Sequence, residues 1–235
     1  MSLIELKEVS KIYLDELQDG GATGPATSAL SRATFSVDQG EYVSIMGPSG
    51  SGKSTLLHIL GFLDRPSSGK YTFAGKTMDE LTDVELARVR NEKMGFVFQA
   101  FNLLARTSVL ENVILPLGYS NVPELRWRAL GEEAVAAVGL SHRLFHEPSE
   151  LSGGEKQRVA IARSLVNNPD VIFADEPTGN LDSKSGANVM EIFDTLNKQG
   201  KTVIAITHDE KVAEHARRTI KLRDGKIESD TKVKK

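Results

Sequence analysis

The sequence of 235 residues contains no cysteine, and this absence excludes three kinds of chemistry together. The chain can form no disulfide, bind no zinc through thiolates and use no thiol as a nucleophile. Long apolar runs are also missing. The most apolar stretch covers only residues 56–63 and includes His58, whereas a membrane-spanning helix needs about 20 apolar residues. The first ten residues lack a basic segment followed by an apolar one, so we expect no secretory signal and a cytoplasmic protein.

An excess of charge of one sign is absent as well, because 29 Lys and Arg oppose 32 Asp and Glu, for a formal net charge of −3. This balance gives no global electrostatic reason to expect a nucleic-acid partner. Apolar residues make up 40% and charged residues 26% of the chain, which is ordinary for a globular protein and argues against disorder. The length is ample for a hydrophobic core.

Strand and helix patterns alternate along the chain, which predicts an α/β protein built on a largely parallel sheet. From residue 102 to residue 167 the strand pattern disappears, and segments 125–138 and 153–166 carry apolar residues at helical spacing. A helical insertion of about 102–167 is therefore expected to interrupt the sheet. The expected strands are residues 3–9, 33–37, 42–46, 71–73, 94–98, 171–174, 202–206 and 219–222, with a hairpin-like turn at 224–225.

Two polar segments are expected to lie outside regular structure. Residues 15–28 are rich in Gly, Thr and Ser without periodicity, which is typical of a surface loop. Residues 229–235 are polar and are expected to form a frayed tail. Residues 1–228 would then form a single domain.

Residues 47–54 match the phosphate-loop pattern G-x-x-x-x-G-K-[ST] without a mismatch, between an expected strand and a helical segment. Glycines let backbone N–H groups turn toward phosphate oxygens, and the helix start adds its positive dipole end. Lys53 would neutralise the β- and γ-phosphates, and the Ser54 hydroxyl would ligate Mg²⁺. The alternative is an ordinary Gly/Ser turn. The expected nucleotide-binding residues are Gly47, Pro48, Ser49, Gly50, Ser51, Gly52, Lys53, Ser54 and Thr55.

Two acidic residues end the apolar run of residues 171–174. Such a run suits a buried parallel strand, and ligands of parallel sheets gather at the carboxyl ends of the strands. We therefore expect Asp175 to hold Mg²⁺ through water and Glu176 to polarise the attacking water. Alternatively, both residues simply start a turn before Pro177. Together with the phosphate loop, the acidic pair predicts a phosphate-loop NTPase.

The segment Leu151-Ser152-Gly153-Gly154-Glu155 precedes the acidic strand, and here the sequence resembles the ATP-binding cassette (ABC) ATPases with their LSGGQ-type signature. Ser152, Gly153 and Gly154 would form a second anion-binding helix start, which in that family closes over ATP bound to another subunit. Glu155 replaces the commoner Gln, and we expect it to accept a hydrogen bond from a ribose hydroxyl. Alternatively, the segment is only a helix cap.

Four further positions are similar to the family's pattern. Tyr13 resembles the aromatic residue that stacks on adenine, although a lone tyrosine there is more often a half-buried strand residue. Gln99 looks like the residue that senses Mg²⁺ and the attacking water, and it is counted with the metal site. Asp182 lies in a segment similar to the one that crosses the dimer interface. His208 looks like the histidine that contacts the γ-phosphate, although a lone histidine after a strand is usually structural.

The remaining histidines lack such support. We expect surface or packing positions for His58, His142, His146 and His215.

The resemblance covers residues 3–228, and four segments are similar to the LolD/MacB-type branch of the family. It implies a RecA-like, mainly parallel sheet with an antiparallel β subdomain and an inserted α-helical subdomain. It also implies ATP and Mg²⁺ as cofactors, ATP hydrolysis coupled to transport, a head-to-tail homodimer and an FtsX-like, MacB-like or LolC/E-like membrane permease on the inner face of the cell membrane. The branch segments are residues 45–52, 60–66, 95–99 with 101–104, and 174–182.

Two other functions remain open at this point. An FtsE-like regulatory ATPase would signal through an FtsX-like membrane protein without transport. An ABC ATPase acting on nucleic acid is disfavoured, because tandem cassettes, long coiled coils and zinc cysteines are absent.

The permease is expected to dock on the groove near residues 99–112, where Phe101, Leu103 and Leu104 place apolar side chains close together. The same three residues could instead belong to the core.

Overall fold

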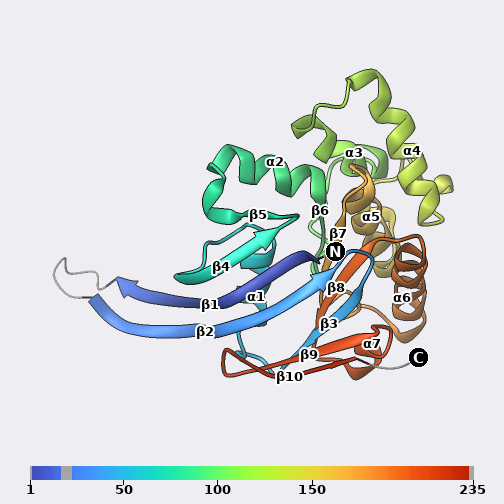
Figure 1. Ribbon diagram of the computed structural model, residues 1–235. Helices are drawn as coiled ribbons and strands as arrows, with labels where there is room; N and C mark the ends of the chain where they lie inside the picture. The colour runs from blue at the N-terminus through green and yellow to red at the C-terminus, as the bar shows by residue number, and fades with distance from the viewer. Residues whose placement is uncertain (1, 17–22, 233–235) are drawn as a thin grey trace.

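A computed structural model describes residues 2–16 and 23–232, and these residues form two sheets with helices around them (Figure 1). The larger sheet has six strands, all parallel except β10, which pairs antiparallel with β9. In spatial order its strands are β10 (Lys226–Lys232), β9 (Arg218–Arg223), β3 (Tyr42–Met46), β8 (Thr202–Thr207), β7 (Val171–Asp175) and β6 (Met94–Val97). The α/β fold with a mainly parallel sheet is confirmed.

The smaller sheet is antiparallel throughout. In spatial order its strands are β2 (Thr23–Asp38), β1 (Ser2–Glu16), β4 (Ser68–Phe73) and β5 (Lys76–Thr77). In Figure 1 the long β1–β2 hairpin extends away from the body of the molecule. This sheet is the antiparallel part that the resemblance implies.

Strand β7 shows why a strand of this parallel sheet has a continuous apolar run as its sequence. Val171 and Phe173 belong to a hydrophobic cluster on one face, whereas Ile172 and Ala174 belong to a second cluster on the other face. Successive side chains of a strand point to opposite faces, so a sheet covered on both sides needs apolar residues at every position.

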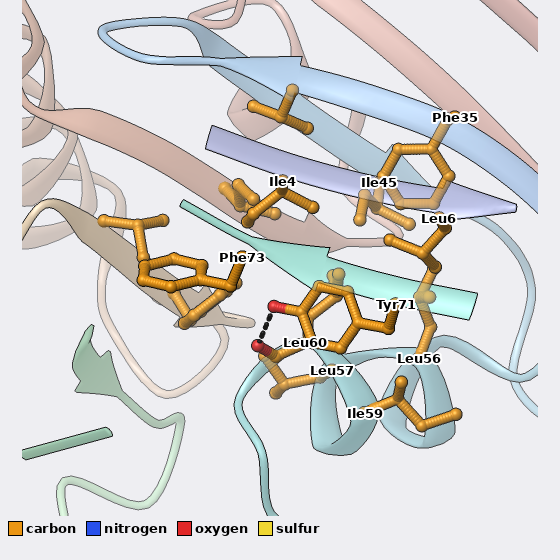
Figure 2. Close-up of a cluster of buried hydrophobic side chains, with 14 of the residues drawn as sticks. Ile4, Leu6, Phe35, Ile45, Leu56, Leu57, Ile59, Leu60, Tyr71 and Phe73 are labelled. Atoms are coloured by element: carbon orange, nitrogen blue, oxygen red, sulfur yellow. Dashed lines mark hydrogen bonds between the residues drawn. The ribbon is translucent and has the colours of Figure 1, made fainter. Parts of the chain in front are cut away.

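The first of these clusters lies between the two sheets and helix α1 (Lys53–Leu60), as Figure 2 shows. Leu56, Leu57, Ile59 and Leu60 are all buried on α1. Tyr71 of β4 is also buried, and its hydroxyl donates a hydrogen bond of 2.6 Å to the carbonyl oxygen of Leu60 at the end of α1. The packing fixes α1, and with it the loop before α1.

Between β6 and β7 the chain forms helices and loops without a strand, which agrees with the expected helical character of residues 102–167. In chain order the helices there are α3 (Val109–Ile114), η2 (Leu115–Tyr119), η3 (Glu124–Arg126), α4 (Trp127–Ala137), η4 (Ser141–Arg143), η5 (Pro148–Glu150) and α5 (Gly153–Leu165), where η marks a 3-10 helix. Among the described residues, no helix combines the length and the apolar character that crossing a membrane requires.

Outside this insertion lie η1 (Met78–Glu80), α2 (Asp83–Lys93), α6 (Ser183–Lys198) and α7 (Glu210–Ala213). Helix α2 carries no apolar periodicity, since Leu86 is its one buried residue. The sequence signal that could have identified α2 is its capping box, in which Thr82 accepts from the N–H of Glu85 and the Glu85 carboxylate accepts from Thr82.

The prediction of a loop at residues 15–28 is wrong for all of its described residues, 15–16 and 23–28. Strand β1 continues to Glu16 and β2 begins at Thr23, and the two pair as far as Leu14 with Ala26 and Glu16 with Thr23. Paired hairpin strands satisfy each other's backbone groups, so they can extend through a segment whose side chains have no periodicity. Residues 17–22 of the expected loop lie outside the described residues.

The expected frayed tail at residues 229–235 is also corrected. Residues 229–232 continue β10, and Asp230 pairs with Ile220 of β9. The carboxylate of Asp230 accepts hydrogen bonds of 2.7 and 2.6 Å from Nε and Nη2 of Arg218, which is buried and also contacts Glu41. A bidentate ion pair therefore holds the strand in place. Residues 233–235 lie outside the described residues.

Replacing Asp230 with Asn is expected to lower the free energy of unfolding by about 2 kcal/mol at neutral pH, because it removes a charge-assisted pair from a buried guanidinium. The hydrogen bonds from Arg218 hold the pKa of Asp230 below its ordinary value. A lowered pKa stabilises the fold above about pH 4 and loses that effect as pH falls further. The difference between the wild type and the variant should therefore vanish in acid, as urea unfolding at several pH values would measure.

Glu228→Gln serves as the control on the same strand, because Glu228 pairs with Arg223 where both side chains are largely exposed. The control should change stability little. If the two variants behaved alike at neutral pH, the Arg218–Asp230 pair would not anchor β10.

Candidate active site

The phosphate loop, residues 47–52, connects β3 to α1 and packs tightly on both sides. Gly52 has a φ of +99°, and a Cβ there would lie 2.4 Å from the carbonyl oxygen of Ala29 on β2. A Cβ at Gly47 would lie 2.2 Å from the carbonyl oxygen of Leu222 on β9. Only glycine fits at these two positions, because the backbone approaches its neighbours this closely.

Two side chains indicate an anion as the ligand of this loop, Ser51 within it and Lys53 directly after it. Nζ of Lys53 donates to the carbonyl oxygens of Gly47 and Pro48 at 2.7 and 2.9 Å, and no carboxylate among the described residues lies within ion-pair distance of it. The hydroxyl of Ser51 is buried without a hydrogen-bond partner. A cation bent over the loop and an unsatisfied buried hydroxyl fit a phosphate group, which accepts from both.

The acidic pair lies at the carboxyl end of β7. Burial raises the pKa of Asp175, and the neighbouring Glu176 raises it further, whereas His58 and Lys53 oppose the shift. Lys53 and His58 both belong to α1, so Asp175 faces this helix. The exposed Ser54 hydroxyl follows Lys53 at the start of the helix. Carboxylate and hydroxyl oxygens are suitable ligands for Mg²⁺, directly or through water.

Glu176 is held firmly by the end of the neighbouring strand β8. Its carboxylate accepts from the Thr207 hydroxyl at 3.0 Å and from the His208 N–H at 3.1 Å. Its backbone N–H donates to Ile206 at 2.8 Å, and its φ is +44°. Because parallel strands end at one edge of the sheet, residues that are distant in sequence meet here.

The His208 ring contacts the same carboxylate. Nδ1 lies 2.7 Å from Oε1 of Glu176, and since a carboxylate only accepts, Nδ1 donates. The side chain of His208 is 70% exposed, whereas that of Glu176 is 16% exposed. The Nε2 side of the ring is therefore available for a ligand. Sequence reasoning overlooked Thr207, whose signal is a hydroxyl residue that directly follows the apolar run of residues 203–206.

The signature segment begins helix α5. Ser152 is its N-cap and accepts from the N–H of Glu155, while the Glu155 carboxylate accepts from both the N–H and the hydroxyl of Ser152. The other Glu155 oxygen pairs with Arg143 at 3.1 Å. Both oxygens therefore have partners within the chain, and these partners compete with the expected ribose hydroxyl.

Residues 152–155 are separate from the phosphate loop. In the described part of the chain, no hydrogen bond or ion pair joins them to residues 47–55. Their neighbours are instead the residues before and within α6. A Cβ at Gly153 would lie 3.8 Å from the carbonyl oxygen of Asn180, and one at Gly154 would lie 2.8 Å from Cβ of Ser185.

Gln99 and Asp182 lie on either side of Asn180, whose carbonyl oxygen is close to Gly153. The Gln99 amide donates to Oδ1 of Asn180 at 3.3 Å, and the Asn180 amide donates to the Gln99 carbonyl oxygen at 3.0 Å. Asp182 is the N-cap of α6 and accepts from Ser185 and Lys184 at 3.0 Å each, and these hydrogen bonds lower the pKa of Asp182. The expected sensor residue Gln99 therefore contacts Asn180, two residues before the expected interface residue Asp182.

Tyr13 lies on the hairpin beside the phosphate loop. It pairs with Thr27 of β2. Two residues further along β2 is Ala29, whose carbonyl oxygen lies close to Gly52 of the loop. Its hydroxyl donates to Asp64 at 2.9 Å, and Nζ of Lys11 lies 5.0 Å from the centroid of its ring. The side chain is exposed enough, at 39%, for a flat ligand to reach the ring.

The structure thus divides the expected site residues into two groups. The first group consists of the phosphate loop, Lys53, Ser54, Asp175, Glu176 and His208. Gly47, Pro48 and His208 of this group line a cavity of about 340 Å³ beside β9. The second group consists of residues 152–155 with Asp182. Gln99 lies between the two groups, since a Cβ on Gly179 would lie 2.7 Å from its Nε2 and the Gly179 N–H donates to the carbonyl oxygen of Glu176 at 3.0 Å. Each group could bind phosphate, but the contacts within one chain do not bring both to the same ligand.

Comparisons with known proteins identify relatives of this chain. Residues 30–179 match the model of the family described as ABC transporter. An uncharacterized ABC transporter ATP-binding protein of Thermotoga maritima is 49% identical over 96% of this chain and 94% of its own length. The macrolide export ATP-binding/permease protein MacB of Bdellovibrio bacteriovorus is 48% identical over 98% of this chain, which spans 34% of that protein.

Among solved structures, the chain is similar to the ATP-binding cassette MJ0796, described as the dimeric structure of a post-hydrolysis state bound to ADP and Pi. The TM-score is 0.86 and the sequence identity is 42%, and the match covers 99% of both chains.

Proposed function

Because the chain belongs to the ABC transporter family and is an ATPase of that family, we propose that two copies bind two ATP·Mg²⁺ head to tail and drive a membrane permease. The observation that carries this proposal is the separation of the two phosphate-binding groups. One nucleotide would contact the phosphate loop of one copy and the signature segment of the other. The fused ATP-binding/permease architecture of the MacB relative supports a permease as partner.

In the first half of the proposed site, the phosphate loop binds the triphosphate. Backbone N–H groups of residues 47–52 and the start of α1 face the phosphates, and Lys53 would exchange its bonds to Gly47 and Pro48 for phosphate oxygens. Ser54 and Asp175 would hold Mg²⁺, which when bound neutralises phosphate charge. Tyr13 would stack on the adenine.

Hydrolysis would depend on Glu176. Its carboxylate is fixed by Thr207 and His208, so one oxygen can accept a proton from a water aligned with the γ-phosphate. The free side of the His208 ring would contact the γ-phosphate, and Gln99 would leave Asn180 to approach the water and Mg²⁺. Positioning and electrostatic stabilisation supply most of the rate enhancement, because phosphoryl transfer needs no protein nucleophile.

In the second half of the proposed site, Ser152, Gly153 and Gly154 of the other copy would bind the γ-phosphate. These residues start a helix of 13 residues, whose unpaired N–H groups and dipole favour an anion. Asp182 would lie at the same interface, since the segment before α6 packs on the signature segment.

The permease would dock on a cavity of about 480 Å³ that lies between α2, β6, η2 and α5. Three of its lining residues, Leu63, Leu115 and Tyr119, are 47%, 41% and 78% exposed. An amphipathic helix on the cytoplasmic side of the permease would cover this apolar surface. The contact would keep the ATPase on the inner face of the membrane, and the LolD/MacB-type branch would make the permease FtsX-like.

The position of this cavity differs from that of the docking groove expected near residues 99–112. Leu103 packs against the second hydrophobic cluster, and Phe101 is half-buried. Leu104 alone of the three expected residues is well exposed, at 49%. The described cavity includes Phe98 but none of those three residues.

Light scattering of the Glu176→Gln protein tests the proposed dimer. Without hydrolysis, ATP·Mg²⁺ should convert monomers to dimers, whereas ADP should not, because ADP lacks the γ-phosphate that both copies contact. A protein that stays monomeric with saturating ATP would contradict the head-to-tail arrangement.

A further inference from the structure

Glu155 introduces a negative charge at the start of α5. Its Oε2 accepts from the N–H and the hydroxyl of Ser152 at 2.9 Å each. These hydrogen bonds, chiefly the one from the backbone N–H, lower the pKa of Glu155, and Arg143 lowers it further, so the group is ionised at neutral pH. The carboxylate is thus one hydrogen bond from the residue proposed to meet a phosphate, and charges of like sign repel at that distance.

Arg143 is the cation that opposes this charge. Its Nε lies 3.1 Å from Oε1 of Glu155, and the side chains of the pair are only 33% and 15% exposed. Its Nη1 lies 3.0 Å from Nε2 of His146, which accepts because a guanidinium only donates. Partial burial strengthens such a pair relative to one in open solvent.

The backbone around Arg143 is anchored to the rest of the helical insertion. The Arg143 N–H donates to Leu140 at 2.8 Å. The carbonyl oxygens of Leu144 and His146 accept from Leu110 and Val109 at the start of α3, at 3.0 and 2.9 Å. The guanidinium therefore needs little reorganisation to stay on Glu155.

We propose that Arg143 is a positioning residue for the signature segment, whose guanidinium neutralises Glu155 so that Ser152, Gly153 and Gly154 can bind the phosphate of a nucleotide held by a second copy. This inference rests on the proposed head-to-tail dimer. It also explains how Glu can occupy a position where a neutral Gln would place no charge near the phosphate. Arg143 acts through Glu155 and is not itself required to touch ATP.

A double-mutant cycle tests the proposal, with every protein carrying Glu176→Gln so that ATP is not consumed. Arg143→Gln should weaken ATP-driven dimerisation about 10-fold per site, hence about 100-fold in the dimer dissociation constant, since one dimer contains two sites. In the presence of Glu155→Gln, the same change should cost less than about threefold. Gln at position 155 keeps the capping box while removing the charge.

Three further measurements separate the effect of charge from the effect of shape. The loss caused by Arg143→Gln should shrink as salt is raised, because ions screen the uncompensated carboxylate. Arg128→Gln is the matched control, since Arg128 pairs with Glu132 at 2.8 Å on the exposed face of α4. That variant should dimerise normally. A fluorescent ATP analogue should bind all monomers equally, which shows that the phosphate loop is intact.

The outcomes are distinct. An equal loss in both backgrounds, or no loss in either, would overturn the role of Arg143 while leaving the proposed dimer in place. Failure of the Glu176→Gln protein itself to dimerise with ATP would overturn both the proposed function and this inference. Rescue by Glu155→Gln supports the assignment.

Discussion

Glu176→Gln is expected to reduce ATP turnover about 10³-fold and to change ATP binding by less than about twofold. A positioned general base typically contributes 10²–10⁴-fold, and a carboxamide cannot accept the proton. Its oxygen can take the place of Oε1 and accept from His208, and its NH2 group can donate to the Thr207 hydroxyl oxygen in the place of Oε2, so the end of β8 should keep its arrangement. Phosphate release measures the turnover, and equilibrium titration with ATP measures the binding.

Glu191→Gln is the control for this change, because Glu191 is exposed on α6 and lies outside the two groups of site residues. It removes the same charge and should hydrolyse ATP at the wild-type rate. Wild-type turnover by the Glu176→Gln protein would mean that the base is assigned wrongly. Loss of ATP binding would instead mean that Glu176 supports the phosphate loop.

Ser152→Arg is expected to abolish ATP-driven dimerisation, by more than about 100-fold, while a monomer still binds ATP. The long side chain would fill the start of α5 where a phosphate of the other copy is proposed to bind. It also removes the N-cap hydroxyl that accepts from Glu155, which costs about 1 kcal/mol of stability. Monomer binding should persist because the phosphate loop makes no hydrogen bond to Ser152 among the described residues. Light scattering of the variant, combined with Glu176→Gln, measures the loss.

Ser108→Arg is a matched control for the folding cost. Ser108 is the N-cap of α3 and forms the same capping box, with Glu111 in the place of Glu155. Both variants lose an equivalent cap, but only Ser152→Arg should prevent dimerisation. If Ser152→Arg monomers failed to bind ATP, Ser152 would belong to the site of its own chain. A normal ATP-driven dimer would show that the signature segment is not at the interface.

Much of the site was predictable because it depends on short contiguous patterns. The phosphate loop needs glycine at positions of positive φ, and Gly50 and Gly52 have φ of +78° and +99°. The buried strand before Asp175 requires apolar residues on both faces, so its sequence reveals the strand and its end. The capping box of Ser152 and Glu155 also lies within four residues, although its consequence for the ribose contact was not foreseen.

Other features depend on residues that are distant in sequence and follow no periodic pattern. The position of residues 229–232 in β10 depends on the contact of Asp230 with Arg218 across the β9–β10 hairpin. The continuation of β1 and β2 through a polar segment depends on pairing between strands. Arg143 reaches Glu155 only because the backbone between them is anchored to α3.

The printed order of amino acids thus already specified the α/β alternation, the phosphate loop and the acidic strand end, since each follows from local backbone preference and the burial of neighbouring positions. The contacts between the parts of the site depend on the tertiary structure. It brought Glu176 to Thr207 and His208, kept the signature segment away from the phosphate loop, and placed Arg143 on Glu155. Side-chain contacts of this kind depend on how strands and helices pack, and packing is a property of the whole chain rather than of any short segment.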